Sequence, residues 1–125
     1  MRVLLDTHVF LWAVTDSRRL SEQARRSILD ADAIYVSAAS IWEAAIKAGL
    51  GRIEGDMGQL AGAIGSSGFM ELPVTAAHAA AVARLPHHHR DPFDRLLVAQ
   101  AMAEPLVLLT ADAALLPYSE LVHLV

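Results

Sequence analysis

The sequence has 125 residues, the usual size of one domain, and a chain of this length buries roughly two-thirds of its unfolded surface on folding. Hydrophobic residues make up 54% and charged residues 19%, which excludes an intrinsically disordered chain. The absence of cysteine excludes disulfides, thiolate zinc sites and cysteine nucleophiles, and the net charge of −4 argues against a surface that attracts nucleic acid everywhere. No apolar run is long enough for a signal peptide or a membrane span. We therefore expect a soluble, cytoplasmic protein with one domain over residues 1–125.

The first half of the chain predicts strands that alternate with helices. Short, continuously apolar runs indicate strands at 2–6 and 33–37. Helical spacing and helix caps, with Ser21 as one N-cap, indicate helices at 7–14, 20–31, 37–51 and 56–68. We expect the second helix to bury Ala24, Ile28 and Leu29, and the third to bury Ile41, Ala45, Ile46 and Leu50.

The second half continues this alternation. Residues 69–74 form a third strand candidate, which Pro73 restricts to an edge or a strand end. The alanine-rich segment 75–85 is helical, and Pro86 ends it. Asp91 and Pro92 indicate the start of a helix over 91–104, with Asp91 as its N-cap. A strand, a short helix and a terminal strand are expected at 106–110, 112–116 and 121–125.

This pattern predicts an α/β fold. Continuously apolar strands between helices are typical of a parallel sheet that is covered on both faces. We expect an α/β/α sandwich with a mostly parallel central sheet of four to five strands. In such sheets, ligands bind beyond the carboxyl ends of the strands, where the strand order reverses. Side chains that follow the strands are therefore the candidates for chemistry.

Four acidic residues occupy such positions. Asp6 and Asp112 follow predicted strands, while Glu43 and Asp94 lie in helices next to strands. Each has a purely structural explanation, because Asp6 and Asp112 can cap the following helices and Asp94 suits the dipole of a first helical turn. Both alternatives stay open for each residue taken singly.

Glu43 has two structural explanations of its own. It completes a capping-box spacing with Ser40, and it precedes Lys47 by four residues as a helix ion pair. The joint pattern favours a site, because Glu43 and Asp94 lie in otherwise apolar helices. Carboxylates gathered at one sheet edge repel one another and raise each other's pKa unless a cation intervenes. An all-oxygen site suits Mg²⁺ or Mn²⁺, which can lower the pKa of water and stabilise a leaving oxygen.

Three consecutive histidines form a competing candidate. His87, His88 and His89 precede the helix at 91–104, but neighbouring side chains diverge, so we do not expect the three to bind one ion. A solvated loop is the simpler interpretation. We expect His89 and Arg90 to lie close enough to the acids to contact a phosphate.

Four segments of the chain together resemble a known family. LLDTHVFLW, SAASIWEAAIKAGLG, HHHRDPFDRLLVAQA and LLTAD are similar, in content and order, to blocks of PIN domains and, within these, of the VapC-type toxins of bacterial toxin–antitoxin pairs. The resemblance implies a parallel sheet between helices, Mg²⁺- or Mn²⁺-dependent ribonuclease activity, homodimerisation and inhibition by a cognate antitoxin. Residues 37–65 offer a contact surface for a homodimer.

The resemblance also implies roles for particular residues. The catalytic acids fall on Asp6, Glu43, Asp94 and Asp112, with Asp6 and Asp94 as metal ligands and the other two binding directly or through water. Asp91 matches a family position, but its role as a helix cap also explains it. Thr110 matches a threonine that shapes the turn and bonds a carboxylate.

Other functions remain open from the residues alone. One is a metal-dependent phosphatase or DNA nuclease, although an aspartyl-phosphate enzyme needs a second acid two residues after Asp6, where His8 stands. Another is a non-catalytic module whose acids bind an arginine of an antitoxin.

Overall fold

The computed structural model describes residues 1–125 and contains one five-stranded sheet. All four strand pairs are parallel, and the strand order is β3-β2-β1-β4-β5. The strands are β1 (Arg2–Leu5), β2 (Ala33–Ser37), β3 (Met70–Leu72), β4 (Val107–Thr110) and β5 (Val122–Leu124). The predicted α/β/α fold is thus confirmed, with a sheet that is wholly parallel. Pro73 directly follows β3, which is an edge strand as expected.

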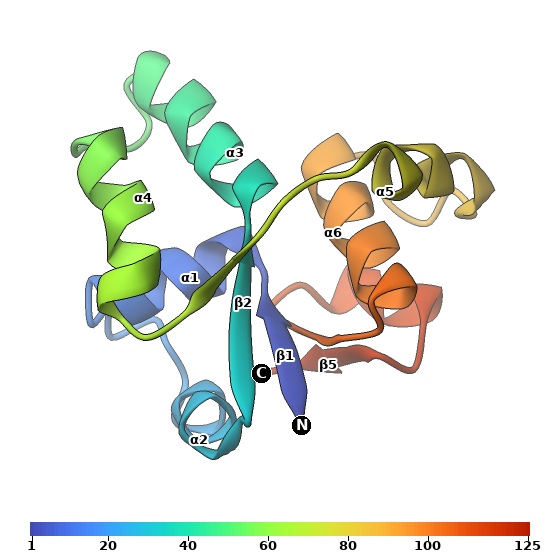
Figure 1. The fold of residues 1–125 in the computed structure, drawn as a ribbon, viewed down its shortest axis with the longest axis horizontal. Coiled ribbons are helices and arrows are strands. Elements are labelled where there is room, and N and C mark those ends of the chain that lie inside the picture. Colours follow the sequence, from blue (N-terminus) through green and yellow to red (C-terminus); the bar gives the residue numbers. More distant parts are fainter.

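Helices cover both faces of this sheet. They are α1 (Thr7–Val14), α2 (Glu22–Asp30), α3 (Ala38–Gly49), α4 (Met57–Ser66), α5 (Ala76–Ala81) and α6 (Pro92–Ala103), with 3₁₀ helices η1 (Val82–Arg84) and η2 (Ala113–Tyr118). α1, α2 and α4 lie on one side of the sheet, and α5 and α6 lie on the other (Figure 1). No helix is long and apolar enough to cross a membrane.

The core has two halves because successive strand residues point to opposite faces. Val3 and Leu5 of β1 pack with α1 and α4, whereas Leu4 packs with α6 and η2. All three side chains are fully buried. Burial on both faces explains why the strand sequences are continuously apolar.

Two predicted helix faces are correct only in part. In α2, Ala24 is buried and Ile28 packs on the core, but Leu29 is 82% exposed, because the residue after Ile28 turns away from the face that Ala24 and Ile28 share. In α3, Ile41 packs against the core as expected, but Ala45 is exposed, and Ile46 and Leu50 are 41% and 64% exposed.

The buried face of α3 carries other residues. It consists of Ala39, Ser40, Glu43 and Ala44. Polar Ser40 and Glu43 thus lie inside, while a stripe of apolar residues faces solvent. Beyond Ile41, the residues of the predicted apolar face of α3 are therefore exposed to solvent.

The topology places a switch point beside β1. From β1 the chain passes outward through β2 to β3 and then crosses back to β4, which pairs with the other side of β1. The carboxyl ends of β1 and β4 are therefore the place where a doubly wound sheet binds ligands. Asp6 follows β1 directly, and Asp112 lies two residues beyond β4.

Candidate functional site

The two carboxylate oxygens of Asp6 have different roles: Oδ1 caps a helix, and Oδ2 faces inward. Its Oδ1 accepts a hydrogen bond from the Val9 amide at 2.9 Å, so it caps α1 as predicted. Its Oδ2 accepts a hydrogen bond from the Thr110 hydroxyl at 2.5 Å, a length typical of a charged acceptor. The residue is 4% exposed, and this burial raises the pKa of the Asp6 carboxyl although the bonds from Thr110 and Val9 oppose the rise.

Asp112 divides its oxygens in the same way. Oδ1 caps η2 by accepting from the Ala114 amide at 3.0 Å, and Oδ2 accepts from His89 Nε2 at 2.9 Å. The Asp112 amide donates to the Thr110 hydroxyl at 3.0 Å. Thr110 therefore connects Asp6 to Asp112, which agrees with the expectation that it shapes the turn and bonds a carboxylate.

Asp94 lies in the first turn of α6 and accepts no hydrogen bond with its carboxylate. Asp91 begins this helix, since its Oδ1 accepts from the amides of Phe93 and Asp94 at 2.8 and 3.2 Å. The His89 Nε2 atom lies 3.7 Å from Asp94 Oδ2, beyond hydrogen-bond distance. Burial raises the pKa of Asp94 to about 7, and repulsion from Asp91, Asp6 and Glu43 adds to the rise.

Glu43 is 3% exposed, and only one of its two carboxylate oxygens has a polar partner. Its Oε2 binds Lys47 Nζ at 2.6 Å, so the predicted ion pair is present, while its buried Oε1 has no hydrogen-bond partner. The capping-box alternative is wrong, because Ser37 is the N-cap of α3 and the buried Ser40 hydroxyl accepts a hydrogen bond from Thr7 at 2.9 Å. A capping role therefore does not explain Glu43.

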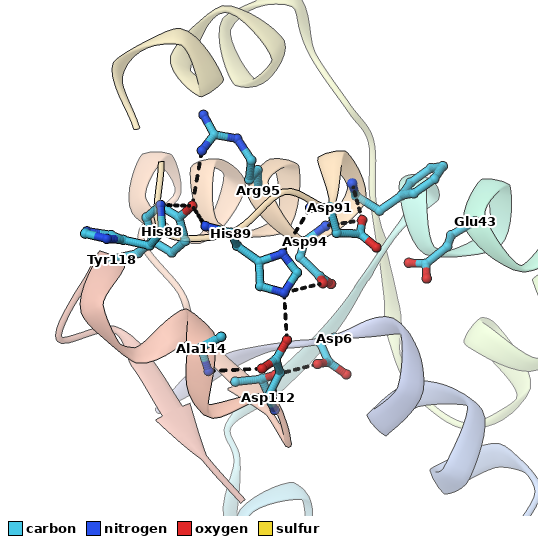
Figure 2. A network of polar contacts seen from close by, with 12 residues as sticks. Asp6, Glu43, His88, His89, Asp91, Asp94, Arg95, Asp112, Ala114 and Tyr118 are labelled. Carbon is cyan, nitrogen blue, oxygen red and sulfur yellow. Dashed lines mark hydrogen bonds and ion pairs between the residues drawn. The ribbon is translucent and has the colours of Figure 1, made fainter. Parts of the chain in front are cut away.

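The four acids face one region of the molecule, but the ligand atoms that all lie within 4.8 Å of one another belong to His89, Asp94 and Asp112, and this group includes neither Asp6 nor Glu43. Figure 2 shows the carboxylates of Asp6, Glu43, Asp94 and Asp112 directed into the space between the ends of β1 and β4, α3 and α6. The donor atoms are hard oxygens, and the carboxylates of Glu43 and Asp94 retain oxygens without hydrogen bonds. An unpartnered carboxylate oxygen in a buried position is costly unless a cation neutralises it. The residues present therefore fit Mg²⁺ or Mn²⁺.

His89 belongs to this region, but its ring is oriented as a hydrogen-bond donor. Ligand atoms of His89, Asp94 and Asp112 lie within 4.8 Å of one another, a spacing that three metal ligands can have. However, His89 Nδ1 accepts from the Asp91 amide at 3.0 Å, so Nδ1 carries the lone pair and Nε2 carries the proton. A ligating nitrogen needs its lone pair for the metal, so this tautomer orients Asp112 and binds no ion through Nε2.

The other loop residues point elsewhere. His87, His88 and Arg90 are exposed, and His88 packs edge-on against Tyr118 with ring centres 5.0 Å apart. The three histidines diverge, as expected from their adjacency. Arg90 forms no ion pair with the acids.

Sequence reasoning missed the support beneath this loop. The Arg95 guanidinium donates to the Pro86 carbonyl at 2.9 Å and to the Tyr118 hydroxyl at 3.1 Å, and the residue is 8% exposed. The Tyr118 hydroxyl also accepts from the amides of His88 and His89. The sequence contains a signal for this network, because Arg95 lies inside the otherwise apolar run of α6. An arginine is rarely buried without a partner, so this position predicts partners for its guanidinium.

Comparison with known proteins identifies the family of this chain. The PIN-domain family model matches residues 3–120, and the chain belongs to the PIN-domain family. No curated protein matches the sequence.

Solved structures agree with this class at the level of the fold. VapBC2 from Rickettsia felis, bound to a DNA fragment from its promoter, has a TM-score of 0.67 at 15% identity and covers 99% of this chain and 97% of that one. A toxin–antitoxin complex from Klebsiella pneumoniae has a TM-score of 0.61 at 17% identity, with 88% and 86% covered. FitAcB from Neisseria gonorrhoeae has a TM-score of 0.61 at 19% identity, with 91% and 89% covered.

Proposed function

We propose that the chain is a Mg²⁺- or Mn²⁺-dependent endoribonuclease toxin that hydrolyses RNA phosphodiester bonds in the cytoplasm. The observation that carries this proposal is the gathering of four carboxylates at the switch point, where Asp94 accepts no hydrogen bond and Glu43 Oε1 has no partner. Membership of the PIN-domain family supports a nuclease, because PIN domains are generally nucleases. A cluster of carboxylates that contains no serine or cysteine nucleophile also favours cation-assisted hydrolysis over covalent catalysis.

Each acid has a part in this proposal. Asp6 and Asp94 are the direct ligands, and Glu43 and Asp112 hold the ion directly or through water. A divalent ion, when bound, supplies Lewis-acid chemistry: it lowers the pKa of a water molecule and stabilises charge on the leaving oxygen. Thr110 orients the free oxygen of Asp6, and His89 orients Asp112, so both fix carboxylates that would otherwise rotate.

A cognate antitoxin and a second copy of the chain are the proposed protein partners. Support for the antitoxin comes from the similar structures, which include toxin–antitoxin complexes. Support for a homodimer comes from α3, where Trp42, Ile46 and Leu50 are 60%, 41% and 64% exposed. An exposed apolar stripe of this kind is typical of a contact surface.

The test is hydrolysis by purified chain freed of any partner. Single-stranded RNA, single-stranded DNA and a small phosphate ester are each incubated with Mg²⁺, with Mn²⁺ or with a chelator. We expect cleavage of RNA alone, and only with a divalent ion. Asp6→Asn or Asp94→Asn should abolish this cleavage and keep the circular dichroism spectrum, because both substitutions preserve side-chain size.

The same panel separates the alternatives. Hydrolysis of DNA or of the phosphate ester would replace the ribonuclease with another metal-dependent phosphodiesterase or phosphatase. A folded chain that cleaves none of the substrates with either ion would support a non-catalytic module that binds an antitoxin. Normal RNA cleavage by Asp94→Asn would contradict the assignment of the site.

A further inference from the structure

The loop that carries the three histidines borders an open cavity of about 810 Å³ beside the acidic site. Its polar lining consists of His87, His88, His89, Arg90 and Arg95, and no carboxylate lines it. The chain as a whole has a net charge of −4, so a cavity lined only by basic and neutral groups is a local exception.

The cavity contains positive charge that the protein does not neutralise. Arg95 donates to backbone carbonyls and to the Tyr118 hydroxyl, and neither Arg95 nor Arg90 is ion-paired with an acid. The carbonyl acceptors include Val82 and Leu85, at 3.3 and 3.4 Å from Arg95 Nη2. A buried guanidinium without a carboxylate retains its charge, and that charge favours an anion nearby.

The loop is held in one shape by these same contacts. Figure 2 shows Arg95 and the amides of His88 and His89 meeting at the Tyr118 hydroxyl. With the backbone fixed in this way, His87, His88 and Arg90 remain exposed while His89 turns toward Asp112. Polar groups held by buried contacts bind a ligand at a smaller entropic cost than mobile ones.

The cavity and the acidic site are adjacent, and one residue borders both. His89 lines the cavity, and its Nε2–H reaches Asp112 at 2.9 Å. A polyanion in the cavity would therefore have its next charged group beside the four acids. Imidazole and guanidinium planes also stack on unpaired bases, as is common in recognition of single-stranded RNA.

We propose that this cavity binds the single-stranded RNA segment next to the phosphodiester that is cleaved. Arg90 binds its phosphates, the charge of the buried Arg95 attracts them from beneath the loop, and His87 and His88 contact its phosphates or bases. This inference rests on the proposed ribonuclease function and adds the surface that holds the substrate.

The experiment measures binding without cleavage, in the Asp94→Asn background. Fluorescence anisotropy gives the affinity for a labelled single-stranded RNA with Mg²⁺ at several salt concentrations. The added pair His87→Ala and Arg90→Ala lies on exposed side chains, so the fold should persist. The matched control, Arg18→Ala with Arg19→Ala, removes exposed charge from the segment between α1 and α2.

We expect the cavity pair to weaken RNA binding about tenfold or more and to reduce the slope of log affinity against log salt by about 0.7, because one phosphate contact to a single strand is lost. The control should change affinity less than about twofold. No measurable RNA binding by the background protein, or equal affinity with the cavity pair substituted, would overturn the inference. Cavity-dependent binding by a chain that never cleaves RNA would support the inference and refute the nuclease.

Discussion

Asp6 and Asp112 combine two roles that sequence reasoning treats as alternatives. Each uses Oδ1 to cap a helix and directs Oδ2 toward the acidic site, where Thr110 or His89 donates to it. A cap fixes the carboxylate at a strand end, so the structural role helps to orient the second oxygen. The sequence predicts both roles, but it cannot show that they coexist, because that depends on which oxygen faces inward.

Asp94 makes the stability of the metal-free chain depend on pH. Its pKa is about 7 in the folded chain against an ordinary value of 3.8, so between these values the folded state holds a proton that the unfolded state has released. The contribution of this group to stability therefore falls as pH rises from about 4 to about 7.

Asp94→Asn removes this dependence. We expect the free energy of unfolding of the variant, relative to the wild type, to rise by on the order of 1 to 2 kcal/mol between pH 5 and pH 8, a value reduced for partial solvent screening. Urea unfolding in chelator at the two pH values measures it. A difference that is the same at both would mean that Asp94 is not held protonated.

Thr110 is the single hydroxyl that joins two of the acids. Thr110→Val keeps the shape but leaves Asp6 Oδ2 without its donor and the Asp112 amide without its acceptor. We expect a loss of about 1 to 3 kcal/mol in the free energy of unfolding, whereas Thr110→Ser should retain most of it because the hydroxyl remains. Equal losses in the two variants would assign the effect to packing and not to the hydroxyl.

Among the elements, α6 is the best predicted and α3 the worst in its orientation. Asp91 and Pro92 specify the start of α6 by local chemistry that needs no tertiary information. In α3 the spacing predicts a helix correctly, but the sequence has two candidate faces. Burial of Ser40 and Glu43 instead of Ile46 and Leu50 reflects the acidic site and the proposed partner surface.

The exposed stripe of α3 makes a prediction about assembly. Ile46→Asp with Leu50→Asp should convert the proposed homodimer to a monomer in light scattering, with the melting temperature of the monomer little changed, because both side chains are already exposed. Leu29→Asp is a matched control, since Leu29 is 82% exposed on α2. An unchanged mass for the double variant, or a dimer disrupted equally by Leu29→Asp, would place the contact elsewhere.

At the scale of the whole molecule, strand order brings the acids together. Asp6 and Asp112 are far apart in sequence, and they meet because β4 returns to the side of β1. The sequence predicts the strands and their parallel direction from apolar patterning, but strand order depends on long-range packing that no local signal encodes. The same holds for Arg95, whose partners at residues 82–86 and 118 converge only in the folded chain.

The central claim is that these four carboxylates bind a divalent cation. Its most direct measurement is titration of the wild type and of Asp94→Asn with Mn²⁺, with bound ion counted by electron paramagnetic resonance. We predict saturable binding to the wild type and at least about tenfold weaker binding to the variant, because Asp94 is a proposed direct ligand with no other partner. Equal Mn²⁺ binding by the two proteins, or no binding by the wild type, would contradict the account.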